Sequence, residues 1–180
     1  MASVKTEIGA EIKDKKGELI KVTPFRECHS LLKGFIQVLA VGISQVFSTI
    51  KDTGGTDRAI YWDGGNFRMN AVAQTTFGIL IGTGNTAVTM ADNALETQLT
   101  TDIAHNTVSF AVENPDAATW RVAIGRGFVN NTGAAVTIKE VAAYGYMGGS
   151  FIGCMDRTLY EVTFEAGETL TLTYRITATL

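Results

Sequence analysis

The C-terminal stretch TLTLTYRITATL (residues 169–180) decides the fold class. Apolar side chains occupy the even positions from Leu170 to Ile176, and threonine or arginine occupies the odd positions between them. Successive side chains of a β-strand point to opposite faces, so this alternation predicts a strand with one buried face and one solvent-facing side. Such a strand is typical of an antiparallel sheet with one wet face.

Similar runs precede this strand, and each is bounded by Gly, Asn or Asp. Turns are predicted at Asn130-Asn131-Thr132-Gly133 and at Glu165-Ala166-Gly167-Glu168. Roughly eight strands at such spacing, with no helix between successive strands, predict a mainly β protein with an antiparallel β-sandwich or jelly roll. The runs lie at residues 58–72 (two short strands), 75–83, 107–113, 119–130, 134–147 and 149–164.

The N-terminal region has a different pattern. Residues 10–13 and 18–23 flank Lys15-Lys16-Gly17 and predict a β-hairpin. Thr23-Pro24 offers a helix start, and the apolar spacing that follows predicts one amphipathic helix from about Pro24 or Ser30 to Ile50. We therefore expect two parts. Residues 1–57 form a hairpin plus helix for assembly or core packing, and residues 58–180 form the β domain.

Residues 34–50 (GFIQVLAVGISQVFSTI) contain no charged side chain. The length of this stretch lies at the lower limit for a segment that spans a bilayer. Polar residues such as Gln37 and Gln45 interrupt this stretch, so an amphipathic helix packed on protein explains it better than a membrane span. The first residues carry charges with no apolar stretch after them, so no secretory signal is expected.

Charge and cysteine content exclude other classes. The chain has 15 Lys and Arg against 18 Asp and Glu, a net charge of −3, with no block of like charges, so nucleic-acid binding is not expected as its main task. Cys28 and Cys154 are too far apart and too few for a disulfide framework, and they lack the neighbouring ligands of a metal site.

Residues 82–87 (GTGNTA) match the glycine fingerprint of dinucleotide-binding proteins. That fingerprint needs a parallel βαβ unit, whereas the residues after Ala87 offer at most one short helical turn near residues 92–99. We therefore interpret Gly78, Gly82 and Gly84 as turn and close-packing residues.

No residue is assigned a catalytic, cofactor-binding or metal-binding role. Cys28 and His29 are adjacent and would point about 100° apart on a helix, so they cannot act as nucleophile and base. His105 lies in a polar connector, which favours a solvated loop histidine. Glu161 and Glu165 are expected on the outward side of a strand, and a small hydrolase would need them to converge with another acid.

Three further patterns carry weaker hypotheses. Asp52, Asp57 and Asp63 lack the spacing of an EF-hand loop. Asn130-Asn131-Thr132 is a formal glycosylation acceptor that we interpret as a turn. The aromatic residues next to glycine turns are modest candidates for a carbohydrate or protein surface; they are Tyr61, Trp62 and Tyr146.

Three phrases in the β-rich part carry a resemblance. GILIGTGNTAVTMADNALETQL (78–99), GFVNNTGAAVTIKEVAAYG (127–145) and CMDRTLYEVTFEAGETLTLTYRITATL (154–180) resemble a broad group of virion structural proteins of tailed bacteriophages with a jelly-roll-like β domain. Residues 14–39 also resemble the start of that group, where a short hairpin leads into a helix. The chain departs from the group at residues 142–145, where Ala-Ala-Tyr-Gly replaces an expected Gly-Leu-Tyr ending.

The resemblance implies a non-enzymatic virion structural protein without a cofactor. A capsid decoration or cement protein on the head shell is expected first, and a head-to-tail or tail accessory protein is the alternative. That alternative includes a ring, a fibre base or a receptor-binding module with a carbohydrate-binding β-sandwich. The implied partners are further copies of the chain, other virion proteins such as the major capsid protein, and a surface glycan. The implied location is the virion, after synthesis in the bacterial host cytoplasm.

Overall fold

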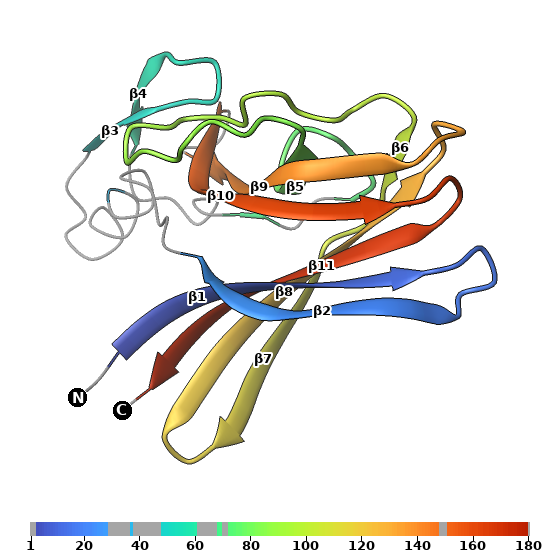
Figure 1. The fold of residues 1–180 in the computed structure, drawn as a ribbon. Helices are drawn as coiled ribbons and strands as arrows, with labels where there is room; N and C mark the ends of the chain where they lie inside the picture. Colours follow the sequence, from blue (N-terminus) through green and yellow to red (C-terminus); the bar gives the residue numbers. More distant parts are fainter. Residues whose placement is uncertain are drawn as a thin grey trace.

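The protein is mainly β, and all named strands pair in antiparallel fashion (Figure 1). The computed structural model describes residues 3–28, 37, 48–60, 68–69, 72–147 and 151–179. The strands in these ranges are β1 (Ser3–Lys13), β2 (Leu19–Cys28), β3 (Ser48–Lys51), β4 (Asp57–Ile60), β5 (Gly78–Gly82), β6 (Ile103–His105), β7 (Ser109–Asp116), β8 (Thr119–Asn130), β9 (Val136–Met147), β10 (Phe151–Phe164) and β11 (Thr169–Thr179).

A six-stranded sheet forms one layer, in the order β2-β1-β11-β8-β6, with β7 also paired to β8. Strands β1 and β11 pair without a break from Ser3 opposite Thr179 to Lys13 opposite Thr169. The first and last strands are therefore neighbours in the centre of this sheet. The N-terminal hairpin and the C-terminal strand, which lie on either side of the expected boundary at residue 57, belong to the same sheet. The expected division into an assembly or core-packing segment and a β domain stays a prediction.

A three-stranded sheet, in the order β10-β9-β5, faces the larger sheet, and a small β3-β4 sheet lies at one end (Figure 1). Buried apolar side chains from both large sheets form one core, including Ile8 and Leu172 on one side and Ile79 and Val141 on the other. The Tyr174 hydroxyl also donates a hydrogen bond across the core to Asp156. The arrangement is sandwich-like, as the strand pattern predicted.

Strand β11 largely follows its sequence pattern. Leu170, Leu172 and Tyr174 are buried on the core side, which confirms the predicted inward face. Thr177 lies on the opposite face but is only 2% exposed, because Arg121 of β8 lies against it and donates from Nε to its hydroxyl at 3.4 Å. The opposite face is therefore not wet along its whole length.

The predicted turns are present. Gly17 adopts φ +87° between β1 and β2, and the Asp14 carboxylate accepts hydrogen bonds from the backbone N–H groups of Lys16 and Glu18. Gly167 adopts φ +79° between β10 and β11. Glycine reaches this left-handed region without the steric cost that a side chain imposes. The N-terminal hairpin is confirmed, with strands longer than expected.

The predicted helix boundaries are wrong. Residues 24–28 belong to β2 and residues 48–51 form β3. Pairing with β1 overrides the local helix signals, and Pro24 is tolerated because it lies at a register shift on an edge strand, where its missing N–H is not needed. Of residues 29–47, only Gln37 is among those described. In the described part of the chain no helix is long and apolar enough to cross a membrane.

Arg126 of β8 ties a loop segment to the larger sheet. Its side chain is 1% exposed. Its guanidinium donates hydrogen bonds to the backbone carbonyl oxygen of Gln74 and to four other backbone carbonyl oxygens at 2.8 to 3.4 Å. Burial lowers its pKa to about 10, which still leaves it charged at neutral pH. The other carbonyl groups belong to Val72, Phe77, Ile79 and Asn106.

Replacing Arg126 should destabilise the fold strongly. Arg126→Met removes the donors and leaves several buried carbonyl groups unpaired, so we expect the free energy of unfolding to fall by at least about 3 kcal/mol. Urea denaturation measures this change. Arg121→Met is the matched control, because its ion pair with Glu113 is partly exposed and is expected to contribute about 1 kcal/mol or less. Equal losses in both variants would contradict this role for Arg126.

Candidate functional site

The glycine loop after β5 binds carboxylates of its own chain. The Glu140 carboxylate of β9 is fully buried and accepts backbone N–H groups of Gly84 at 3.0 Å, Glu96 at 3.1 Å and Thr97 at 2.9 Å. The Glu96 carboxylate accepts those of Asn85 and Thr86 at 2.9 and 3.0 Å. The N–H groups that could hold a phosphate are thus occupied by Glu140 and Glu96.

Close approach explains the glycines of this loop. A Cβ atom at Gly82 would lie 2.5 Å from a carboxylate oxygen of Glu140, and one at Gly84 would lie 2.4 Å from Cβ of Glu96. Strand β5 also pairs antiparallel with β9, whereas a dinucleotide fold requires parallel strands. The interpretation of Gly82 and Gly84 as close-packing residues is confirmed.

Arg157 of β10 completes a buried ionic network around Glu140. Its side chain is 3% exposed, and it donates from Nε to Glu140 at 2.8 Å and from Nη1 to Asp92 at 2.7 Å. Burial raises the pKa of Asp92, but hydrogen bonds from Thr89 and Arg157 outweigh it and hold that pKa below its ordinary value. Backbone and hydroxyl hydrogen bonds from Thr86 lower the pKa of Glu96. The network holds loop 83–98 on the face of the three-stranded sheet opposite the core.

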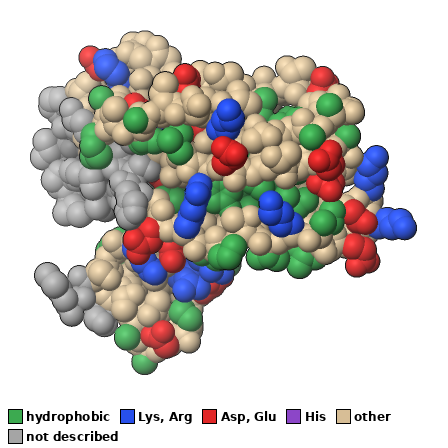
Figure 2. Space-filling model, viewed as in Figure 1, with side chains coloured by type: hydrophobic (Ala, Val, Ile, Leu, Met, Phe, Trp, Pro, Cys, Tyr) green, Lys and Arg blue, Asp and Glu red, His purple; other side chains and the backbone are tan. Residues whose placement is uncertain are grey.

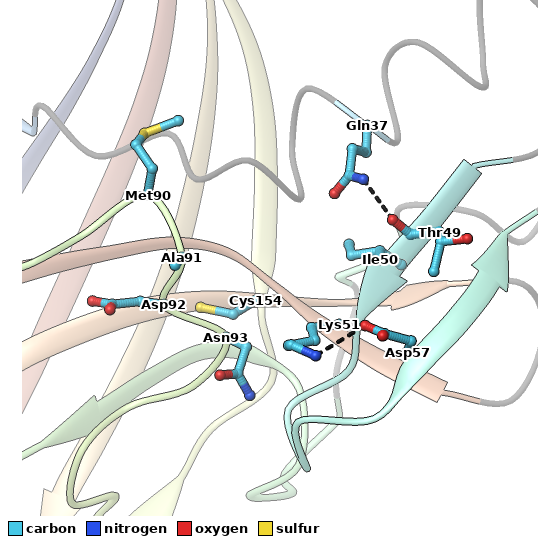
Figure 3. A pocket seen from close by; sticks show the side chains of 10 residues that line it. All are labelled: Gln37, Thr49, Ile50, Lys51, Asp57, Met90, Ala91, Asp92, Asn93 and Cys154. Atoms are coloured by element: carbon cyan, nitrogen blue, oxygen red, sulfur yellow. Dashed lines mark hydrogen bonds and ion pairs between the residues drawn. The ribbon is translucent and has the colours of Figure 1, made fainter.

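A cavity of about 150 Å³ lies beside this network (Figure 3). It is lined by β3, β4, residues 90–93 and Cys154 of β10. The charged groups on its wall are paired, since Lys51 lies 3.0 Å from Asp57 and Asp92 is held by Arg157. Burial raises the pKa of the Cys154 thiol well above its ordinary value, and its Sγ donates to the backbone carbonyl of Asp156. A protonated, buried thiol is a poor nucleophile.

The predicted environment of His105 is wrong. This residue lies in β6, is 5% exposed, and stacks edge-on against Phe128 with ring centroids 5.0 Å apart. Burial and the charge of Arg126 lower its pKa to about 4. Pairing of β6 with β8 brings a residue of a polar segment into the core, which local composition does not indicate. Cys28 is also buried, at the end of β2, and His29 lies outside the described residues.

Among the acidic residues considered in the sequence, Asp52 has a structural role. The Asp52 carboxylate accepts hydrogen bonds from Gly54, Thr56 and Arg58 and thereby closes the β3–β4 turn. Glu161 is exposed beside the inward-facing Val162, as predicted. In the described ranges no cluster of three or more His, Cys, Asp or Glu side chains could hold a metal ion. Asp63 lies outside these ranges, and Glu165 is exposed after β10.

The remaining candidates are mostly buried or not described. Asn130 is fully buried, and its side-chain amide donates to the carbonyl oxygens of Ala134 and Phe164, so it is a turn residue rather than an accessible glycosylation acceptor. Tyr146 is partly buried and packs edge-on against Phe77 with centroids 4.7 Å apart. Tyr61 and Trp62 lie outside the described residues.

An exposed apolar surface was missed by the sequence analysis. At one end of the six-stranded sheet, the face that elsewhere packs on the core extends past the three-stranded sheet (Figure 1). We call this end, made of residues 3–6, 110–122 and 176–179, the sheet extension. Its large apolar side chains are 38 to 73% exposed; they are Val4, Phe110, Val112, Trp120 and Val122.

Register places these side chains on the core-facing side. Val112 pairs with Val122, and Phe110 pairs with Ile124, which is buried in the core. Directly paired residues in a sheet point to the same face. In Figure 2 the extension projects from the body of the molecule, and scattered hydrophobic side chains lie among charged and other groups on the side that is visible. The alternation of apolar and polar residues in β7 and β8 indicates an apolar face on each strand. It does not indicate whether another part of the chain covers that face.

No family model matches the sequence, and comparison with curated proteins and with solved structures returns no significant match. The function is accordingly inferred from the chain's own geometry and from the resemblance described above. Two features stand out: a self-contained ionic network that holds the glycine loop, and an apolar sheet extension without a cover in the described structure.

Glu140→Gln should loosen the glycine loop. The neutral amide removes the charge opposite the buried Arg157 and one acceptor oxygen, so the free energy of unfolding should fall by about 3 kcal/mol. Hydrogen exchange at the amides of Gly84 and Thr97 should accelerate more than in the sheets. Glu161→Gln is the control, since its exposed carboxylate should contribute little. Unchanged protection in the Glu140 variant would refute this role for its carboxylate.

His105 should make stability depend on pH. Its pKa is about 4 in the folded chain and near 6.5 in the unfolded chain, so its contribution is complete above pH 6.5 and is lost as pH falls toward 4. His105→Gln should flatten the stability curve in this window by up to about 1.4 kcal/mol per pH unit. Phe128→Leu, which disturbs the same packing without removing a titrating group, should keep the slope. Urea denaturation at several pH values tests both variants.

Proposed function

We propose that this chain is a non-enzymatic structural protein of a tailed-phage virion and that it works by binding other protein surfaces. The sheet extension is the observation that carries the proposal. Contiguous exposed apolar surface of a few hundred Å² marks association sites on soluble proteins. Val112 and Trp120 are more than half exposed, although Ile124, four residues after Trp120 on β8, is buried in the core.

The rest of the described structure supports a scaffold role. Arg126, Glu140 and Arg157 are buried charges whose contacts are with other parts of the same chain. Such contacts hold loops firmly against the sheets, and the charged groups that make them stabilise the fold. A virion component needs this kind of rigidity, because it must keep its shape while many copies bind a shell.

The finer assignment comes from the resemblance. It favours a jelly-roll-like domain that decorates or cements the head shell, with the major capsid protein as a partner. The alternative is a head-to-tail or tail accessory protein. Trp120 favours one version of this alternative, because an exposed indole ring can stack on a sugar and could belong to a receptor-binding module.

Virions from a phage that carries this gene provide the test. The purified particles should contain the chain in many copies, measured by quantitative mass spectrometry against the major capsid protein. A decoration protein should approach the copy number of capsid subunits, whereas a tail accessory protein should be present in a few to a few tens of copies. Absence of the chain from purified particles would overturn the proposed function.

A glycan array separates the receptor-binding version from the others. Binding that is lost in Trp120→Ala but kept in Tyr146→Phe would support a sugar site on the extension, because Tyr146 lies partly buried on a different sheet. The decoration role predicts no glycan binding by either the natural chain or the variants.

A further inference from the structure

We propose that the sheet extension is covered by the sheet extension of a second copy, stacked face to face about a two-fold axis. This inference rests on the proposed function, in which the extension is an assembly surface, and it names the partner. The dimer should be weak and dependent on concentration.

The apolar face of the extension continues over four neighbouring strands, β1, β11, β8 and β7. Val4, Ala178 and Trp120 form one row across β1, β11 and β8. The next row is apolar except for Thr6, whose hydroxyl donates to the carbonyl of Cys28 at 2.7 Å. This second row consists of Thr6, Ile176, Val122 and Val112. These two rows contain no charged side chain, so a charged partner surface would lose its hydration without gaining a counter-charge.

Apart from Asp116 at the end of β7, whose carboxylate accepts a hydrogen bond from the backbone N–H of Ala118 at 2.9 Å, the charges of the extension lie on its opposite face and are paired within the copy. Lys5 contacts Glu7 at 3.0 Å, and Arg121 contacts Glu113 at 3.1 Å. These residues occupy the odd positions of β1, β7 and β8, so they point away from the apolar rows. Two copies can therefore stack their apolar faces without placing like charges against each other. The small net charge of −3 per copy adds little repulsion.

A second sheet is the partner that fits such a face. Further along the same strands, this face is covered by the three-stranded sheet, as the buried Ile8, Tyr174 and Ile124 show. Sheets pack on sheets through alternate apolar side chains at a spacing of about 10 Å. The extension of another copy offers the same face, and a two-fold axis makes the contact closed and self-complementary.

The available area fits a weak dimer. The exposed parts of the five large apolar side chains amount to roughly 500 Å² per copy, given the surface of aromatic and aliphatic side chains. A face-to-face pair would bury about 1,000 Å² in total, the lower limit for a specific interface. Reversible association is therefore expected in place of an obligate dimer.

Sedimentation equilibrium of the full chain tests the inference. The average mass should rise from the 19.3 kDa of one copy toward twice that value as the concentration increases to about 1 mM. Added salt should not weaken the association, because no intermolecular ion pair holds it. A chain that stays monomeric at every concentration would overturn the proposed dimer.

Val112→Glu and its neighbour Ala111→Glu form a matched pair. Both residues are exposed on β7, but Val112 lies on the apolar face and Ala111 on the opposite face. Val112→Glu should weaken the dimer at least tenfold, and Ala111→Glu should leave it unchanged. Circular dichroism and the urea midpoint show whether each variant is folded. Equal effects of the two changes would contradict the assignment of the face.

Charge pairing gives a test that does not depend on lost association. A Val112→Glu, Val122→Glu variant and a Val112→Lys, Val122→Lys variant should each be monomeric, and an equimolar mixture should form a dimer at low salt. Failure of the mixture to associate would contradict face-to-face stacking. The composition of the virion tests the proposed function independently of the dimer. If the chain is present in particles but monomeric in solution, only the proposed dimer is refuted.

Discussion

A buried carboxylate organises one half of this molecule. Glu140 is inaccessible to solvent, so its charge is stable only with the hydrogen bonds of Gly84, Glu96 and Thr97 and with the guanidinium of Arg157. These contacts pull the glycine loop onto the three-stranded sheet and require glycine where the backbone passes closest to the carboxylate. The same contacts use the N–H groups that make such a loop resemble a phosphate site.

Arg126 has the complementary role on the other sheet. It is a buried cation that donates to several backbone carbonyl groups and so fixes residues 72–79 against β8. The two groups satisfy backbone atoms of irregular segments, which cannot pair within a sheet and would otherwise be buried without partners. The described loops are thus held by charged side chains, while the sheets are held by their own ladders and the apolar core.

This interior contrasts with the sheet extension. Inside the molecule every charge discussed above has a partner, whereas Val112 and Trp120 on the extension expose apolar surface to solvent. Within the described residues, the charged groups of the network and on the wall of the cavity in Figure 3 are paired inside the chain. The virion proposal joins this surface to the resemblance in the β-rich sequence.

Local sequence determined the strands, the hairpin and the turns, because alternation and glycine placement act over a few residues, as in β11 and at Gly17 and Gly167. Only the tertiary structure decided the rest. Pairing with β1 made a strand of residues 24–28, and pairing with β8 buried His105. Glu140 and Arg157 meet because adjacent strands bring residues 17 positions apart together, and Trp120 is exposed because the second sheet ends before it. Such contacts depend on which segments, far apart in the sequence, pack together in the fold. A local sequence pattern does not indicate these pairings.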